Sequence, residues 1–172
     1  MKKIKITFLF IIAIVLLSSC KDDEVEEPIV EADNYTVIVD GAELANNSEK
    51  VYSAIGAEGN MDLSIKNVSS ATINLKMKVV SINGNYSGVE DSMNFCIGNC
   101  YTLVVEGNSY PLDEIYSLEA GQTSQQDAIH IQNLDDRSGD LAFKIKLYQV
   151  DSSGNELTSK KSVNFTYKYI AP

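Results

Sequence analysis

The chain has 172 residues, and its 24 acidic against 14 basic side chains give a formal net charge of −10. This excess of acid argues against nucleic acid as a partner, because affinity for phosphate backbones depends on Lys and Arg neutralising the phosphates. A chain of this length can bury about two-thirds of the surface that its unfolded form exposes, so a domain with a core of its own is expected.

The N-terminus begins with a basic segment and continues with an apolar one. Lys2, Lys3 and Lys5 precede an uncharged apolar run at residues 6–17, and two serines then lead to Cys20. A membrane-spanning helix needs about 20 apolar residues, so this run is too short to cross a bilayer. Its length and its basic flank are typical of a secretory signal peptide.

Residues 17–20, Leu-Ser-Ser-Cys, resemble the lipobox of bacterial lipoproteins. The resemblance implies that residues 1–19 are a signal peptide, that the thiol of Cys20 carries a diacylglycerol, and that its freed amine carries an acyl chain such as palmitate. The residues that follow are similar to the export tag of Bacteroidota lipoproteins, a lysine followed by acids: Lys21, Asp22, Asp23 and Glu24. That similarity implies an outer-membrane location facing the cell exterior, and the periplasmic face is the alternative.

Residues 20–34 are expected to form a lipidated acidic tether. Half of the residues from 21 to 34 are acidic, and no apolar period runs through them. Self-repulsion and low hydrophobicity favour a solvated segment over one that joins a core. Residues 35–172 are then expected to form the folded domain.

Apolar and polar residues alternate with a period of two through much of this domain, which predicts strands. Asp40-Gly41 and Asn83-Gly84 have the composition of two-residue hairpin turns, and residues 151–155 are predicted to form a turn. No stretch after residue 20 keeps a helical apolar period for three turns. We therefore predict an all-β chain of about seven to eight strands in an antiparallel sandwich, with strands at residues 35–39, 61–65, 73–79, 129–131, 141–147 and 163–169.

The second half of the chain contains four landmarks. They are Phe-Cys-Ile-Gly-Asn-Cys-Tyr at 95–101, Leu-Glu-Ala-Gly-Gln-Thr-Ser at 118–124, Gly-Asp-Leu-Ala-Phe-Lys-Ile at 139–145 and Val-Asn-Phe-Thr-Tyr at 163–167. With these landmarks, residues 96–169 resemble an immunoglobulin-like module of secreted Bacteroidota proteins. The resemblance implies an immunoglobulin-like β-sandwich. It indicates a fold and no activity, since such modules occur beside many functions.

Cys96 and Cys100 are the two thiols that remain if Cys20 is acylated. An even count in an exported protein favours a disulfide between them. The alternatives are a redox pair or half of a zinc site. Thioredoxin-type pairs have two intervening residues at a helix start, and zinc would need two further ligands where the chain has a single histidine, His130. We therefore expect a structural disulfide, no metal and no cofactor.

His130 stands between Ile129 and Ile131, so it is expected to project from the opposite face of that strand. A catalytic histidine of the Ser-His-Asp kind would need a positioned nucleophile. The nearest candidate segment, Gly-Asn-Ser-Tyr-Pro at 107–111, lacks the second glycine of a nucleophile elbow. An enzyme is therefore not expected, and a hydrolase is kept as the weaker alternative.

Further residues are candidates for binding or modification. Tyr86, Tyr110 and Tyr116 fall in a long middle region, residues 84–120, that we expect to be irregular and to form the contact surface. The absence of tryptophan argues against carbohydrate stacking there. Asp91-Ser92-Met93 is similar to the O-glycosylation acceptor of exported Bacteroidota proteins, with Ser92 as the modified residue.

An acidic segment raises the question of calcium. Asn133, Asp135, Asp136 and Asp140 crowd one predicted loop. Their order does not match an EF-hand, because Arg137 occupies the place of a ligand. A polar turn between two strands is favoured, and calcium remains the alternative.

These observations predict a lipid-anchored, cell-surface, non-enzymatic binding or adhesion module. Its partners would be the membrane, through the lipid, and a protein or a glycan that the sequence does not identify. The alternative is a structural subunit of an envelope-associated assembly, in which a sheet edge pairs with a neighbour.

Overall fold

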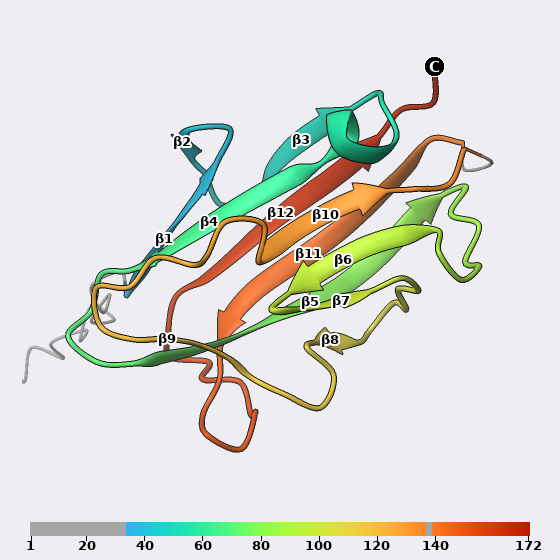
Figure 1. Ribbon diagram of the computed structural model, residues 1–172. Coiled ribbons are helices and arrows are strands. Elements are labelled where there is room, and N and C mark those ends of the chain that lie inside the picture. Colours follow the sequence, from blue (N-terminus) through green and yellow to red (C-terminus); the bar gives the residue numbers. More distant parts are fainter. Residues whose placement is uncertain (1–33, 137–138) are drawn as a thin grey trace, which may run out of the picture. The chain divides into compact units, whose positions relative to one another are not determined.

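The computed structural model describes residues 34–136 and 139–172, whose regular secondary structure is almost entirely β-strand (Figure 1). Cys20 and the four residues of the proposed export tag lie outside the described residues. The short 3-10 helix η1 (Gly56–Gly59) is the helical element of the described part, and no helix there is long and apolar enough to span a bilayer.

Two six-stranded sheets make up the domain (Figure 1). The first sheet, in spatial order, consists of β2 (Ala42–Glu43), β1 (Tyr35–Val39), β4 (Met61–Asn67), β10 (Ile129–Asn133), β6 (Met93–Ile97) and β7 (Asn99–Tyr101). The second consists of β3 (Ser48–Tyr52), β12 (Ser162–Tyr169), β11 (Leu141–Gln149) and β5 (Ile73–Gly84), with β8 (Ser109–Tyr110) and β9 (Tyr116–Leu118) both paired to β5.

The strand order is that of an immunoglobulin-like sandwich. Labelled A to G along the chain, β1, β4, β5, β6, β10, β11 and β12 give the orders A-B-E-D in one sheet and G-F-C in the other, which define the constant-type immunoglobulin fold. All strand pairs are antiparallel except β3 with β12. The predicted fold class is confirmed.

The core lies between the two sheets, because inward and outward side chains alternate along each long strand. In β4 and β12 every second residue is buried over the whole strand, and β11 follows the pattern over most of its length. Each large apolar side chain buried in this way contributes about 1.5–3 kcal/mol. The buried side chains of both sheets form a single cluster, whose largest members include Phe95, Tyr110, Phe143 and Tyr167.

Tyr167 connects the two sheets through its hydroxyl group. The Asn133 N–H donates to the phenol oxygen (3.1 Å), and the phenol donates in turn to the carbonyl of Gly59 (3.0 Å). The ring is fully buried and stacks on Tyr52, with ring centroids 5.2 Å apart. Burial raises the pKa of the Tyr167 phenol to about 12, although the hydrogen bond from Asn133 acts in the opposite direction.

One of the two predicted hairpin turns is present and the other is wrong. Asp40 and Gly41 both have positive φ and connect β1 to β2. Gly84, in contrast, is the last residue of β5 and pairs with Leu141 of β11. A Cβ on Gly84 would lie 2.1 Å from the carbonyl oxygen of Asp140. Glycine is needed there because a neighbouring strand approaches closely, not because the chain reverses.

The expectation that residues 84–120 are irregular is also wrong, because four strands lie within that region. Met93, Phe95 and Ile97 of β6 point into the core, and Cys96 between them is buried as well. Strands β7, β8 and β9 have only two or three residues each, too few to show a period. The edge strand β3, which is polar at most positions, was likewise not predicted.

Candidate functional site

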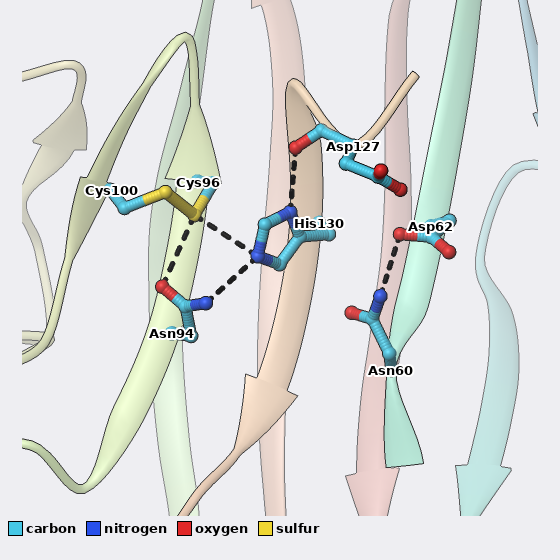
Figure 2. The surroundings of a disulfide bond; sticks show 7 residues. All are labelled: Asn60, Asp62, Asn94, Cys96, Cys100, Asp127 and His130. Atoms are coloured by element: carbon cyan, nitrogen blue, oxygen red, sulfur yellow. Dashed lines mark hydrogen bonds between the residues drawn. A yellow bond between two sulfur atoms is a disulfide. The ribbon is translucent and has the colours of Figure 1, made fainter. Parts of the chain in front are cut away.

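The expected disulfide between Cys96 and Cys100 is present in the hairpin formed by β6 and β7 (Figure 2). The two residues face each other across the hairpin, with Cα atoms 4.0 Å apart. Gly98 occupies the turn with φ of 73°, a conformation that favours glycine. Cys96 is buried, whereas Cys100 is exposed at the edge of the sheet.

His130 lies beside this disulfide on the outer face of the first sheet. In the register of β10, it is paired with Cys96 of β6 on one side and with Asp62 of β4 on the other. Asp62, His130, Cys96 and Cys100 therefore form one row across four neighbouring strands (Figure 2). The prediction that His130 points away from the core is confirmed, since it is half-buried between the two buried isoleucines.

The hydrogen bonds of His130 determine which ring nitrogen carries the proton. Nδ1 is 2.8 Å from the carbonyl oxygen of Asp127, which can only accept. Nε2 is 2.9 Å from the side-chain nitrogen of Asn94, which can only donate. The network therefore assigns the proton to Nδ1 and leaves a lone pair on Nε2, which is 3.2 Å from the sulfur of Cys96.

The structure does not assemble a hydrolase from the residues considered in the sequence. Ser109 is in β8 of the second sheet, whereas His130 faces outward from the first sheet. The hydroxyl of Ser109 accepts a hydrogen bond from Tyr148 (2.9 Å). A nucleophile and its base must lie within hydrogen-bond reach of each other, so these two residues cannot act as such a pair in this fold.

Tyr110 is wrong as a candidate ligand contact, because its side chain is 1% exposed. Its ring packs on Phe95 and Tyr101, with centroids 5.1 Å and 4.8 Å away. Its hydroxyl accepts from the N–H of Val105 (3.0 Å). The alternation of β8 turns this tyrosine into the core, where it cannot meet a ligand.

The other two tyrosines are half-buried and pack against the core. The ring of Tyr86 contacts Phe143 edge-on at 5.1 Å, and its hydroxyl accepts from Ser92 (3.1 Å) and from the N–H of Val104 (3.0 Å). Tyr116 lies against Gly98, and burial raises the pKa of its phenol. In this structure the Tyr86 side chain holds adjacent loop segments in place, and the Tyr116 ring packs against the turn at Gly98.

The proposed glycosylation of Ser92 does not fit the folded domain. Ser92 is fully buried, and its hydroxyl donates to the phenol oxygen of Tyr86. A glycosyl acceptor must be reached by an enzyme at the surface. The match of three residues predicted an accessible Ser92, but the fold buries this side chain.

The acidic segment after β10 is organised by its own backbone. Asn133 is fully buried, and its side chain bonds the carbonyl of Asp135 (3.2 Å) and accepts from the N–H of the same residue (3.4 Å). A carboxylate oxygen of Asp140 accepts from the N–H of Ala171 (3.0 Å). The Asn133 side chain therefore serves a polar turn and does not face the solvent as a calcium ligand would.

A basic surface that the sequence analysis did not identify covers the outer face of the second sheet. Five of the nine lysines in the described part of the chain occupy outward positions of three adjacent strands there. We call this surface the lysine face, and it consists of Lys76, Lys78, Lys144, Lys146 and Lys168. Lysines at alternate positions within β5 and β11 are the sequence signal for this face. The sequence does not show that these lysines lie on one surface, because that follows from the pairing of the two strands.

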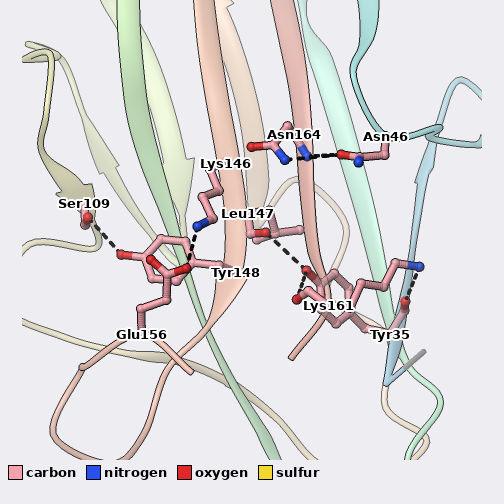
Figure 3. Close-up of polar contacts among 9 residues, drawn as sticks. All are labelled: Tyr35, Asn46, Ser109, Lys146, Leu147, Tyr148, Glu156, Lys161 and Asn164. Carbon is pink, nitrogen blue, oxygen red and sulfur yellow. Dashed lines mark hydrogen bonds and ion pairs between the residues drawn. The ribbon is translucent and has the colours of Figure 1, made fainter. Parts of the chain in front are cut away.

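Three lysines of this face have partners, and two do not. Figure 3 shows Lys146 paired with Glu156 and close to the ring of Tyr148. Lys168 pairs with Glu49, and Lys76 donates to a backbone carbonyl. The side-chain ammonium groups of Lys78 and Lys144 make no hydrogen bond or ion pair with any described residue.

The register places Lys78 directly opposite Lys146. Like charges in that position are destabilising unless an anion offsets them. Glu156 offsets the charge of Lys146, so the uncompensated charge of this face belongs to Lys78 and Lys144. Beside Lys144, the surface is hollowed by a groove of about 290 Å³ whose polar lining includes Asn47, Asn164 and Thr166. The lysine face thus combines uncompensated positive charge with amide and hydroxyl groups.

The first sheet carries a groove of opposite character. It has a volume of about 330 Å³ and is lined by three aspartates, Asp40, Asp62 and Asp127, together with serine and glutamine side chains. This groove of the first sheet is therefore lined by acidic side chains, although Asp40 is ion-paired with Lys50, whereas the lysine face of the second sheet is basic.

No protein-family model matches the chain, and no curated protein matches it. Among solved structures, it is similar to the N-terminal domain of PorA, with 21% identity and a TM-score of 0.43 over 78% of this chain and 96% of that one. It is also similar to a PapD-like domain of human CEP192, with 11% identity and a TM-score of 0.44 over 99% of this chain and 98% of that one. A third similar structure is the CooA pilin subunit of enterotoxigenic Escherichia coli, with 12% identity and a TM-score of 0.39 over 81% of this chain and 99% of that one. The fold assignment rests on the strand order described above.

Proposed function

We propose that this protein is a lipid-anchored, non-enzymatic binding module of the cell surface whose lysine face holds an acidic glycan. The observation that carries the proposal is the gathering of five lysines on one sheet face of a chain whose net charge is −10. Neighbouring strands are about 4.8 Å apart and alternate residues about 6.7 Å apart. Positive charges at these spacings suit a polymer that carries a carboxylate or sulfate on successive sugars.

The composition of the lysine face favours a glycan over a protein. Centres of protein interfaces are enriched in aromatic and apolar side chains and depleted of charge. Beside Lys144, the groove offers the amide groups of Asn47 and Asn164 and the hydroxyl of Thr166, and its lining also includes the exposed Val80. Such amide and hydroxyl groups form hydrogen bonds with sugar hydroxyls.

The overall acidity of the chain affects how this binding depends on salt. At physiological ionic strength, charges separated by more than about 8 Å are largely screened. A bound anion therefore senses mainly the lysines that it contacts and little of the distant acidic residues. Binding should weaken as salt is raised further, because exposed ion pairs are themselves screened.

Charge reversal tests the lysine face. Polygalacturonate should bind the full-length protein in detergent, and neutral dextran should not. The double change Lys78→Glu with Lys144→Glu should weaken binding about 5- to 30-fold, since an exposed ion pair contributes up to about 1 kcal/mol and 1.4 kcal/mol is tenfold. The control, Lys50→Glu with Lys66→Glu, makes the same charge change away from that face.

Three results would contradict the glycan proposal. One is an equal loss of polygalacturonate binding in the test and control variants, which would indicate a non-specific charge effect. A second is undetectable binding of polygalacturonate and of sulfated dextran by the wild type. Capture of an acidic surface protein in place of either polymer would show that the proposed class of ligand is wrong.

The membrane anchor in this proposal rests on the sequence around Cys20. Burial of an acyl chain contributes about 0.8 kcal/mol per methylene, so two or three chains hold a protein on the membrane. Cys20→Ala should yield a protein that is not acylated and does not partition into detergent. Acylation that persists in this variant, measured by mass spectrometry, would refute the lipobox assignment.

Surface exposure is a separate part of the proposal. Changing Lys21, Asp22 and Asp23 to alanine should protect the domain from protease added to intact cells. The matched control changes Glu26, Glu27 and Glu31, acidic residues further along the tether. Unchanged protease sensitivity in the first variant would refute the export tag without affecting the lipid anchor.

A second candidate function, a structural subunit of an envelope assembly, is favoured by one edge strand. The other edges of the two sheets consist of strands of two or three residues, whereas β3 has five. A long open edge can accept a strand from another chain. Val51 of β3 is 51% exposed, and Val51→Lys should abolish such pairing. Because Val51 is paired with Lys168 of the lysine face, the added lysine should not weaken polygalacturonate binding.

A further inference from the structure

Three side chains that commonly bind metals converge on the outer face of the first sheet. The sulfurs of Cys96 and Cys100 and the Nε2 atom of His130 all lie within 4.8 Å of one another. They come from three adjacent strands at one level of the sheet, because His130 pairs with Cys96 and Cys96 with Cys100. The sequence argument against zinc counted a single histidine, but the fold places that histidine at the sulfurs.

His130 is oriented as a metal ligand would be. Metal-binding histidines generally donate their second ring N–H to a carbonyl or carboxylate, which fixes the tautomer and directs the other nitrogen at the metal. Here Nδ1 donates to the carbonyl of Asp127, and the lone pair of Nε2 lies beside the sulfur of Cys96. The side-chain amide of Asn94 now donates to that lone pair (2.9 Å) and would give up this hydrogen bond to a bound cation. Asp127 itself has φ of 60°, an uncommon conformation for a residue with a side chain.

We propose that reduction of the disulfide converts this cluster into a binding site for a thiophilic divalent cation such as Zn²⁺, with Cys96, Cys100 and His130 as ligands. A dithiol reductant supplies two electrons and two protons, becomes a disulfide itself, and leaves two protein thiols. Each thiol loses its proton when the cation binds, so two protons are released per metal ion. A disulfide oxidant reverses the process: it takes two electrons from the two thiolates and two protons from the solvent and becomes a dithiol, and the cation leaves as the protein disulfide forms again.

The distances require little movement of His130. In tetrahedral zinc sites, Zn–S is about 2.3 Å and Zn–N about 2.0 Å, which separates the ligand atoms by about 3.6 Å. Nε2 now lies 3.2 Å from the sulfur of Cys96. The side chain of Cys100 is exposed and can rotate once the sulfur–sulfur bond is broken.

The fourth ligand position is open to Asn94 or to water. The side-chain oxygen of Asn94 lies 3.3 Å from the sulfur of Cys96, and the exposed edge beside Cys100 admits solvent. Asp62 belongs to the same row of residues but lies on the far side of His130, where Asn60 donates to its carboxylate (2.7 Å) (Figure 2). Asp62 is therefore not a ligand, and it provides a control position.

Cobalt binding tests the site, because Co²⁺ reports thiolate ligation and tetrahedral geometry through its absorption spectrum. The full-length protein in detergent is reduced with a phosphine, which takes the oxygen of water to become a phosphine oxide while the disulfide gains two electrons and two protons. The reduced protein should bind one Co²⁺ with sulfur-to-cobalt charge-transfer bands, and Zn²⁺ should displace it. The oxidised protein should show no such bands.

Two variants locate the ligands. His130→Ala should weaken Co²⁺ binding to the reduced protein by at least about tenfold. Loss of a residue that only hydrogen-bonds to a metal ligand already weakens binding by about tenfold or more, and loss of a ligand itself should have at least that effect. Asp62→Asn, in the same row, should change the affinity less than twofold. Circular dichroism of the reduced protein shows whether the fold persists, and if it does not, added Zn²⁺ should restore it.

Several outcomes would overturn the metal site. They are the absence of thiolate-to-cobalt bands in the reduced protein, equal affinity in wild type and His130→Ala, and a reduced chain that stays unfolded when Zn²⁺ is added. The proposal does not depend on the lysine face, which lies on the other sheet. Failure of polygalacturonate binding would therefore leave it unaffected.

Discussion

Tyr167→Phe removes one oxygen atom from the centre of the sandwich and provides a sensitive test of how the two sheets are joined. The phenol accepts from the N–H of Asn133 and donates to the carbonyl of Gly59, and all three residues are buried. A buried polar group left without a partner costs about 1–3 kcal/mol. Two such groups should therefore lower the free energy of unfolding by at least about 2 kcal/mol. At about 2–4 °C per kcal/mol for chains of this size, Tm should fall by at least about 4 °C.

The measurement is urea unfolding followed by circular dichroism, in a Cys20→Ala background that lacks the proposed anchor. The matched control is Tyr169→Phe, because the Tyr169 ring is equally buried but its hydroxyl makes no hydrogen bond to a described residue. That control should stay within about 0.5 kcal/mol of the parent, since no destabilising mechanism applies to it. A loss below about 1 kcal/mol for Tyr167→Phe, or equal losses in the two variants, would refute the reasoning.

Three further predictions concern stability. The Tyr167 phenol has a pKa of about 12 in the fold against 10.0 ordinarily. The stability that it contributes is therefore present below pH 10 and is lost as the pH rises toward 12. The urea midpoint of unfolding should fall over that pH range, and it should fall less steeply in Tyr167→Phe. The double change Cys96→Ser with Cys100→Ser should lower the free energy of unfolding by about 2 kcal/mol at most, because the closed loop is short. A larger loss, measured by urea unfolding, would show that the disulfide stabilises the hairpin by more than chain entropy. Gly84→Ala should lower Tm clearly more than Gly41→Ala. Both glycines have positive φ, so each substitution costs roughly 1–3 kcal/mol of backbone strain, but only at residue 84 does the added Cβ also clash with neighbouring backbone. Equal Tm values in the two variants would contradict this.

Most of the long strands could be predicted because alternation is a local property of the chain. In β12, for example, Val163, Phe165, Tyr167 and Tyr169 must all be buried on one side, and a strand is the conformation that places them there. The Cys96–Cys100 disulfide was predictable for the same reason, since four residues of separation restrict the two thiols to each other's neighbourhood. The outward position of His130 followed from its two apolar neighbours.

Local patterns failed where the environment of a residue comes from distant parts of the chain. Tyr110 and Ser92 belong to segments that resemble exposed loops, yet both are buried because β5 and Tyr86 lie against them. Asn83-Gly84 has the composition of a hairpin turn, but β11 pairs with β5 as far as Gly84, and the backbone at Asp140 and Leu141 lies against this glycine. Nothing within a few residues of these positions carries that information.

By itself, the sequence determined the class of the fold, the faces of its long strands and the candidate anchor at Cys20. Only the tertiary structure decided which residues meet, because strand register is selected by the burial of whole sheet faces and not by any single residue. That register brings His130 to Cys96 and Cys100, and it assembles the five lysines of β5, β11 and β12 on one surface. Both proposed sites therefore arise from strand pairing between segments that are far apart in the chain.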